Sequence, residues 1–199
     1  IDFAAPGVGV LTAKEDTGTM LFSGTSAAAP FVSGSLAALL SSETPRTHQE
    51  VVHVMRKYLD EAGAPGSDPV YGAGVVNWDR LRERNTTTVR DVAVADIYLQ
   101  PNAQPGTTMP IEVIVQNCGT SWLTSAALSV VVGESDPVDF TIGTLGPGQI
   151  TTRKVFAQVP PITSGVPLNI AAQVLTDERL EDVRFENNTK VVLFKPVLR

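Results

Sequence analysis

The chain of 199 residues is acidic and moderately apolar, with 43% hydrophobic residues and a formal net charge of -6 at neutral pH. Residues 1–89 hold 7 Lys or Arg against 10 Asp or Glu and residues 90–199 hold 8 against 11, so each half has a net charge of -3. This balance excludes nucleic-acid binding and recruitment to an anionic membrane, because neither half has a basic surface for phosphate groups, and no apolar run approaches the roughly 20 residues that span a bilayer.

Two helices are predicted in the first 60 residues. The run from Phe31 to Leu40 is apolar nearly all round, which is typical of a buried helix, and this helix is expected to begin near Ser26. A second, amphipathic helix is predicted where Thr47 and Glu50 have the spacing of a capping box. It is expected to end before Gly63. Its apolar face comprises Val51, Val52, Met55 and Leu59.

A loop and a short closing strand are predicted next. Residues Pro65 to Pro69 have loop composition, and Gly72 to Asn77 indicates a tight bend that enters a short strand. Residues Trp78 to Arg84 are predicted to form a last short helix. Near residue 85 the composition changes from Ala-rich helical patterns to alternating Val, Ile and Thr, so the chain is predicted to hold two domains.

The second half predicts an antiparallel β-sandwich. Ile111, Val113 and Val115 alternate with polar residues, as in a strand that has one solvated face. About seven such strands, separated by turns rich in Gly, Pro and Asn, are typical of a sandwich. The other six predicted strands are Val92–Leu99, Ala126–Val132, Asp139–Leu145, Thr151–Val159, Leu168–Leu175 and Thr189–Phe194.

The strongest chemical signal is the heptapeptide Gly24-Thr25-Ser26-Ala27-Ala28-Ala29-Pro30. A serine at the amino-terminal end of a helix can act as a nucleophile while its own backbone NH, free of intrahelical bonding, faces a developing oxyanion. Small residues keep the approach to Ser26 open, and Pro30 has no NH to give to the Ser26 carbonyl. Taken alone, the motif is explained as well by an Ala-rich helix with a capping serine.

Two further motifs flank the heptapeptide: Asp2-Phe3-Ala4-Ala5-Pro6-Gly7-Val8 before it and Tyr71-Gly72-Ala73-Gly74-Val75-Val76-Asn77 after it. Pro6 and Ser26 are 20 residues apart. In order, spacing and residue type, residues 1 to about 84 resemble the carboxyl-terminal part of the subtilisin family of serine proteases (peptidase family S8). That family has an Ala-Pro-Gly strand end, a GTS-x-A-x-P nucleophile motif and a Tyr-Gly-x-Gly-x-Val/Ile-Asn closing strand.

The resemblance implies that Ser26 is the catalytic nucleophile and that its backbone NH is one oxyanion donor. Family members also use an Asp, a His and an oxyanion Asn that precede the serine. The 25 residues before Ser26 contain Asp2 and Asp16 but no His or Asn. We therefore expect a fragment that is inactive alone and needs the missing amino-terminal part of the same protease. The residues that support the nucleophile motif are Gly24, Thr25 and Pro30.

The two histidines of the chain both follow Ser26, and neither matches a family base. His53 points about 180° away from the apolar face of its helix and His48 lies in the first turn, so solvated or helix-end roles are expected. Two positions depart from the family pattern. Ala27 stands where the family often has Met, and Phe31 where it often has His; neither change removes a catalytic group.

The second half resembles the cell-adhesion-related (CARDB-like) domains of bacterial secreted proteins, which have an immunoglobulin-like fold. It shows no catalytic constellation, so it is interpreted as a spacer, substrate-docking or surface-binding module. The segments that carry the resemblance are Asp91-Val92-Ala93-Val94, Val115-Gln116-Asn117-Cys118-Gly119-Thr120, Leu145-Gly146-Pro147-Gly148 and Glu186-Asn187-Asn188.

Neither a metal nor a cofactor is expected in this chain, although calcium is possible in the parent enzyme. The acidic residues near the end of the chain fit a solvated hairpin better than a calcium site. Cys118 is the only cysteine, and we expect a small buried side chain rather than a reactive thiol. The acidic residues in question are Asp177, Glu178, Glu181, Asp182 and Glu186.

Together these features predict an α/β remnant of a subtilisin-like parallel-sheet domain at residues 1–85, a linker at 86–90 and an all-β immunoglobulin-like antiparallel sandwich at 91–199. The function expected first is the nucleophile-bearing part of a secreted serine endopeptidase that acts on protein or peptide substrates. Its expected location is extracellular or at the cell surface. The alternative is an adhesion or binding fragment in which the protease remnant is only a scaffold.

Overall fold

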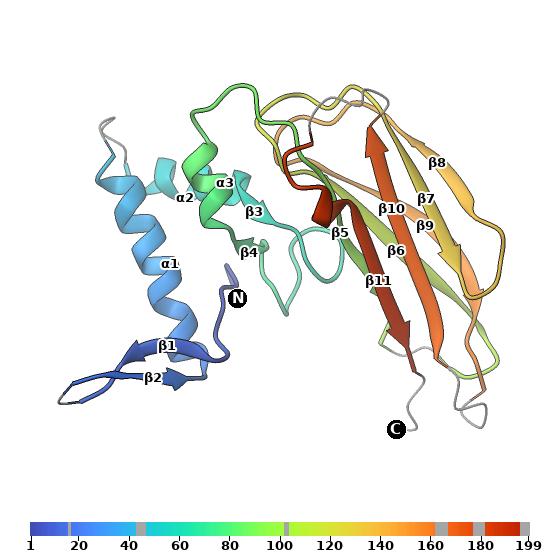
Figure 1. The fold of residues 1–199 in the computed structure, drawn as a ribbon, viewed down its shortest axis with the longest axis horizontal. Helices are drawn as coiled ribbons and strands as arrows, with labels where there is room; N and C mark the ends of the chain where they lie inside the picture. The colour runs from blue at the N-terminus through green and yellow to red at the C-terminus, as the bar shows by residue number, and fades with distance from the viewer. Residues whose placement is uncertain (16, 43–46, 102–103, 162–166, 177–181, 196–199) are drawn as a thin grey trace.

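The computed structural model describes residues 1–15, 17–42, 47–101, 104–161, 167–176 and 182–195. Figure 1 shows that residues 1–84 carry the helices and short strands, whereas residues 91–194 form two larger sheets. We call these the N-terminal part and the sandwich. No helix in the described ranges is long and apolar enough to cross a bilayer.

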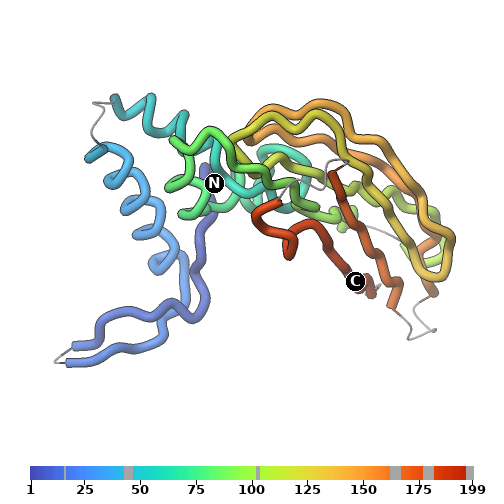
Figure 2. The backbone as a smooth tube through the Cα atoms, turned by 45° about the horizontal axis from the view of Figure 1, so that its top comes forward, coloured from blue at the N-terminus to red at the C-terminus, as the bar shows by residue number. Residues whose placement is uncertain are grey.

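Where the structure describes it, the N-terminal part contains a β-hairpin, three helices and a very short second strand pair. The hairpin lies at the end of the molecule farthest from the sandwich in both views (Figures 1 and 2). In chain order the elements are β1 (Val10–Ala13), β2 (Thr19–Phe22), α1 (Thr25–Leu40), α2 (His48–Lys57), β3 (Leu59–Asp60), β4 (Val75–Val76) and α3 (Trp78–Glu83).

The predicted parallel sheet is not present among the described residues. β1 pairs with β2 and β3 pairs with β4, and both pairs are antiparallel. Residues 14–18 join β1 to β2, and this connection is too short for the crossover of a dozen or more residues that parallel strands need. Among the described residues of the N-terminal part, the one parallel contact is an isolated bridge between Ala4 and Val75.

Helix α1 confirms the predicted start near Ser26 but is less covered than its sequence indicates. Within α1 only Ala27, Ser35 and Leu39 are buried. Leu39 belongs to a small core with Val51 and other residues of α2, β3, β4 and α3, so neighbours cover the carboxyl-terminal half of α1. The amino-terminal half and the hairpin remain largely exposed, because no other described element packs on that side.

Helix α2 begins as predicted and ends earlier. The Thr47 hydroxyl accepts a hydrogen bond from the Glu50 NH, and the Glu50 carboxylate accepts one from the Thr47 NH at 2.7 Å, so the capping box is confirmed. The helix ends at Lys57, and Leu59 belongs to β3 instead of the helix face. Pairing with β4 explains this difference, because it draws Leu59 and Asp60 into an extended conformation.

The predicted antiparallel sandwich is confirmed. One sheet has the strand order β5-β6-β9 and the other β11-β10-β7-β8, and every pairing is antiparallel. Three strands have the predicted bounds, and β6 extends well beyond its alternating centre. The strands are β5 (Val92–Leu99), β6 (Thr108–Asn117), β7 (Ala126–Val132), β8 (Val138–Ile142), β9 (Ile150–Gln158), β10 (Leu168–Thr176) and β11 (Thr189–Phe194).

The two sheets enclose an apolar core that is larger than the core of the N-terminal part. Its members include Ile111, Leu128, Ile142 and Ile170, which are fully buried. Inward-facing residues alternate with outward-facing ones along β10, as expected for a strand with one solvated face. Most of the apolar burial that stabilises the chain therefore lies in the sandwich.

Candidate functional site

Ser26 is the second residue of α1 and its side chain is exposed. Gly24 is the N-cap with φ 150°, in the region that favours glycine, and no side chain caps the helix. The Ala27 NH donates to the Gly24 carbonyl at 2.9 Å. As one of the first four NH groups of the helix, the Ser26 NH has no intrahelical acceptor. Both the hydroxyl and the NH of Ser26 can therefore face a ligand.

The three sequence motifs meet in space. The Gly24 NH donates to the Gly7 carbonyl at 2.7 Å, and a methyl group on Gly7 would lie 3.0 Å from the Gly24 carbonyl oxygen and 3.3 Å from the Ala28 methyl group. The first motif in turn pairs with the third, because the Ala4 NH donates to the Gly74 carbonyl at 3.0 Å. The closing segment thus fixes the strand end, and the strand end fixes the turn before Ser26.

Pro30 lies inside α1, one helical turn after Ser26. It removes the NH that would bond the Ser26 carbonyl, so the first turn of α1 is held by fewer backbone hydrogen bonds than an ordinary turn. The Ser35 hydroxyl donates to the Phe31 carbonyl at 2.6 Å, which gives this buried serine a partner within the same helix.

An apolar groove of about 700 Å³ lies beside Ser26. The hairpin forms one wall through residues such as Leu11 and Met20, and Phe31 of α1 and Trp78 of α3 line the rest. The groove and the hairpin were not predicted from the sequence. The signal for the hairpin was present in two short apolar runs on either side of Gly18.

The described residues offer Ser26 no acid–base partner. His48 and His53 are both exposed on α2, as expected, and α2 packs at the end of α1 remote from Ser26 (Figure 1). Thirteen residues of helix between Ser26 and Leu39 correspond to about 20 Å. Asp2 is exposed and pairs with Arg56 at 3.7 Å. The hydroxyl of Ser26 makes no hydrogen bond to any described side chain.

No group of three or more His, Cys, Asp or Glu within the described ranges is arranged to hold a metal. Most of the acidic residues weighed as a calcium site, Asp177, Glu178 and Glu181, lie outside the described residues. Asp182 is buried, and its carboxylate accepts hydrogen bonds from the NH groups of Val92 at 3.1 Å and Arg184 at 2.9 Å. Its oxygens are thus already used by backbone donors.

Cys118 is the buried, inert thiol that the sequence predicts. It is 6% exposed, and burial raises the pKa of the thiol to about 12, so it is not a thiolate at neutral pH.

Comparison with known proteins finds a similarity for each part. The model of the subtilase family (Peptidase_S8) matches residues 1–74. No curated protein matches the chain. Among solved structures, the chain is similar to a CARDB domain from Pyrococcus furiosus that was crystallised with di-metal ions: 19% identity, 56% of this chain, 92% of that chain, TM-score 0.47. The solution structure of the same domain is 17% identical and has a TM-score of 0.43; the match covers 56% of this chain and 98% of that chain.

A further similar structure is a domain of a Methanosarcina acetivorans protein that is named for an inferred cell-surface location. It is 17% identical, with 56% of this chain and 96% of that chain covered and a TM-score of 0.41. The alternation of the strands and the two observed sheets establish the sandwich independently of these values. Residues 1–74 of the chain match the subtilase family, and an antiparallel β-sandwich follows them.

Proposed function

We propose that this chain is the nucleophile-bearing carboxyl-terminal part of a secreted subtilisin-like serine endopeptidase, with the sandwich as an accessory domain. The observation that carries the proposal is the exposed hydroxyl and NH of Ser26 at the start of a helix, after a turn that is bonded to the first motif, which is in turn bonded to the third. Attack by the hydroxyl on a peptide carbonyl, with the NH donating to the oxyanion, is the chemistry that this geometry favours. Subtilases act on proteins, so we propose protein or peptide substrates.

We propose that residues outside this chain supply the base, the orienting acid and the second oxyanion donor. The groove of about 700 Å³ and the exposed hairpin give these residues an apolar surface on which to pack. The proposed domains are residues 1–85 and 91–199, joined by a linker at 86–90, and the proposed location is extracellular or at the cell surface.

Fluorophosphonate labelling tests this proposal. The chain alone should not be labelled rapidly at neutral pH, because without a base the hydroxyl is a weak nucleophile. The longer polypeptide encoded with its upstream residues should be labelled stoichiometrically, and Ser26→Ala should abolish the labelling. Rapid labelling of the chain alone, lost in Ser26→Ala, would show that the base lies within it. Absence of labelling in the longer polypeptide would instead support the binding function.

A further inference from the structure

Arg80 of α3 connects the N-terminal part to the sandwich. It is the largest fully buried side chain among the described residues, and its side chain is 1% exposed. Its Nε donates to the carbonyl of Cys118 in the sandwich at 3.0 Å, while its Nη1 donates to the Leu59 carbonyl and to Asp60 Oδ1 at 3.0 Å. One buried guanidinium thus binds both parts of the molecule.

Gln116 provides the matching contact from the sandwich. It is 4% exposed; its Nε2 donates to the Leu59 carbonyl at 3.0 Å, and its Oε1 accepts from the Glu61 NH at 3.0 Å. The Leu59 carbonyl therefore accepts one hydrogen bond from Arg80 and one from Gln116. The short β3 strand is held by a side chain from each part.

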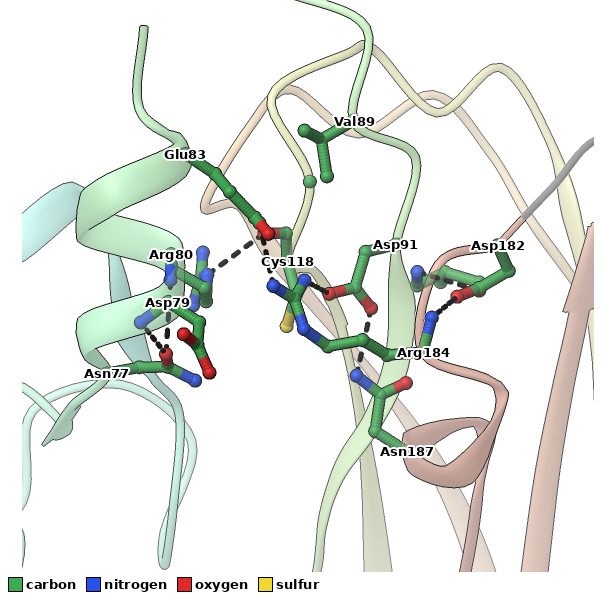
Figure 3. A network of polar contacts seen from close by, with 12 residues as sticks. Asn77, Asp79, Arg80, Glu83, Val89, Asp91, Cys118, Asp182, Arg184 and Asn187 are labelled. Atoms are coloured by element: carbon green, nitrogen blue, oxygen red, sulfur yellow. Dashed lines mark hydrogen bonds and ion pairs between the residues drawn. The ribbon is translucent and has the colours of Figure 1, made fainter. Parts of the chain in front are cut away.

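A second set of polar contacts lies beside this one (Figure 3). Arg184 of the sandwich pairs with Glu83 of α3 at 2.7 Å and with Asp91 at 2.6 Å, and Asn187 donates to Asp91 at 2.9 Å. Burial raises the pKa of Asp91 despite these hydrogen bonds. Desolvation lowers the pKa of Arg184, but its two carboxylate partners raise it more, so the guanidinium stays charged.

Backbones also approach closely between the two parts. Gly148, in the turn before β9, lies against the Lys57 carbonyl so closely that a methyl group at Gly148 would overlap it. The Gly63 NH donates to Asp96 Oδ2 of β5 at 2.7 Å. The two parts therefore approach closely at these points, although a cavity of about 300 Å³ remains between them beside Arg80, Gln116 and Arg184.

Removing one partner from a buried polar contact such as those of Arg80 or Arg184 costs stability, because the remaining polar group stays buried without its hydrogen bond. The core of the N-terminal part has few members, whereas the sandwich has a large core of its own. We infer that the sandwich acts as a folding clamp for residues 47–84, with Arg80 and Gln116 as its contacts, so that both parts unfold as one cooperative unit. This inference does not depend on the proposed protease activity.

The two tryptophans of the chain allow a direct test, because Trp78 begins α3 and Trp122 lies in the sandwich. Trp122→Phe leaves Trp78 as a reporter of the N-terminal part, and Trp78→Phe leaves Trp122 as a reporter of the sandwich. We expect the two full-length variants to give coincident fluorescence curves in urea. Curves with separate midpoints would overturn the inference, since they would show two independent units.

Arg80→Met, made in both reporter backgrounds, should separate the curves. We expect the unfolding equilibrium constant reported by Trp78 to rise at least tenfold more than that reported by Trp122. The matched control is Arg82→Met on the same helix, whose ion pair with Asp79 is 78% and 64% exposed and should contribute little. Equal shifts at both reporters, or no shift beyond that of Arg82→Met, would overturn the inference.

Gln116→Met tests the same contact from the sandwich side and does not alter the N-terminal part. It should likewise raise the unfolding equilibrium constant reported by Trp78 more than that reported by Trp122. This variant decides the matter if Arg80→Met fails to fold, because it removes the two hydrogen bonds from Gln116 to the N-terminal part and leaves those of Arg80 to Asp60 and Cys118 in place. A Gln116→Met variant with unchanged, coincident curves would contradict the clamp.

Discussion

Glu61 is a carboxyl group whose burial has a cost that depends on pH. It is 8% exposed, and desolvation raises its pKa to about 7, helped by the nearby charges of Asp68 and Asp96 and opposed by a hydrogen bond from the Gly66 NH. A folded-state pKa above the usual value of 4.5 means that the folded protein binds the proton more tightly. The contribution of Glu61 to stability is therefore highest below about pH 4.5, and it falls as the pH rises towards 7.

Glu61→Gln should remove this loss. At pH 8 we expect the variant to be more stable than the parent by about 1–3 kcal/mol, and at about pH 4, below the unfolded pKa, the two should be nearly equal, since a shift of one pKa unit corresponds to about 1.4 kcal/mol. Urea unfolding at both pH values measures the difference. Glu134→Gln, on an exposed turn, is the matched control and should leave the pH dependence unchanged. A variant that is less stable than the parent at pH 8 would contradict the prediction.

The three methionines differ sharply in exposure. Met20 is 42% exposed in the groove beside Ser26, whereas Met55 and Met109 are 0% and 3% exposed. Peroxide should therefore oxidise Met20 at least tenfold faster than the other two in the folded chain, because sulfoxide formation needs access to the sulfur. Peptide mass spectrometry over a time course measures the three rates. Similar rates for all three would show that the folded chain opens widely. The position after Ser26, where the resembled family often has Met, is Ala27 and so has no sulfur to oxidise.

At the scale of the element, α2 depends on its capping box. Thr47→Ala removes the hydroxyl that accepts from the Glu50 NH, and we expect a loss of about 1 kcal/mol in the free energy of unfolding. Thr47→Ser keeps the acceptor and should retain most of the stability. Thermal or urea unfolding distinguishes the two variants. Equal stability of Thr47→Ala and Thr47→Ser would mean that the cap contributes nothing measurable.

The strands of the sandwich were predictable because each has one buried and one solvated face, so alternation marks them individually. The hairpin β1–β2 was not predicted, because most of its residues are exposed and its two short apolar runs show no alternation. The carboxyl-terminal end of α2 was misplaced because the apolar spacing of Leu59 also fits a helix. Pairing with β4, a contact remote in sequence, decides its conformation.

The Ser26 motif was visible in the sequence because three short segments keep fixed order and spacing. The contact between the two parts was not visible. Arg80 and Gln116 look like ordinary polar surface residues in the sequence, and only the folded chain brings them to the same carbonyl of Leu59. Burial of a polar residue is a tertiary property that local patterns do not report.

At the scale of the whole molecule, substitutions at two glycines distinguish the cost of backbone strain from the cost of close contact between the two parts. Gly106 and Gly148 have φ values of 77° and 80°, but a methyl group would meet nothing within 4 Å at Gly106 and would overlap the Lys57 carbonyl at Gly148. Gly106→Ala should cost about 1 kcal/mol from strain alone. Gly148→Ala should cost clearly more, because the two parts must also move apart. Urea midpoints measure both. Equal costs would show that the contact at Lys57 yields easily.

The exposed hairpin has a consequence for the behaviour of the chain in solution. β1 and β2 pair only with each other among the described residues, so both outer edges are open, and Leu11 and Leu21 are 66% and 70% exposed. Unpaired strand edges with apolar side chains are templates for association with other copies. The chain on its own should aggregate with rising concentration, as seen by light scattering, and a Leu11→Lys, Leu21→Lys variant should suppress this through charge repulsion. We therefore expect the surface beside Ser26 to be the place where the isolated chain is least soluble.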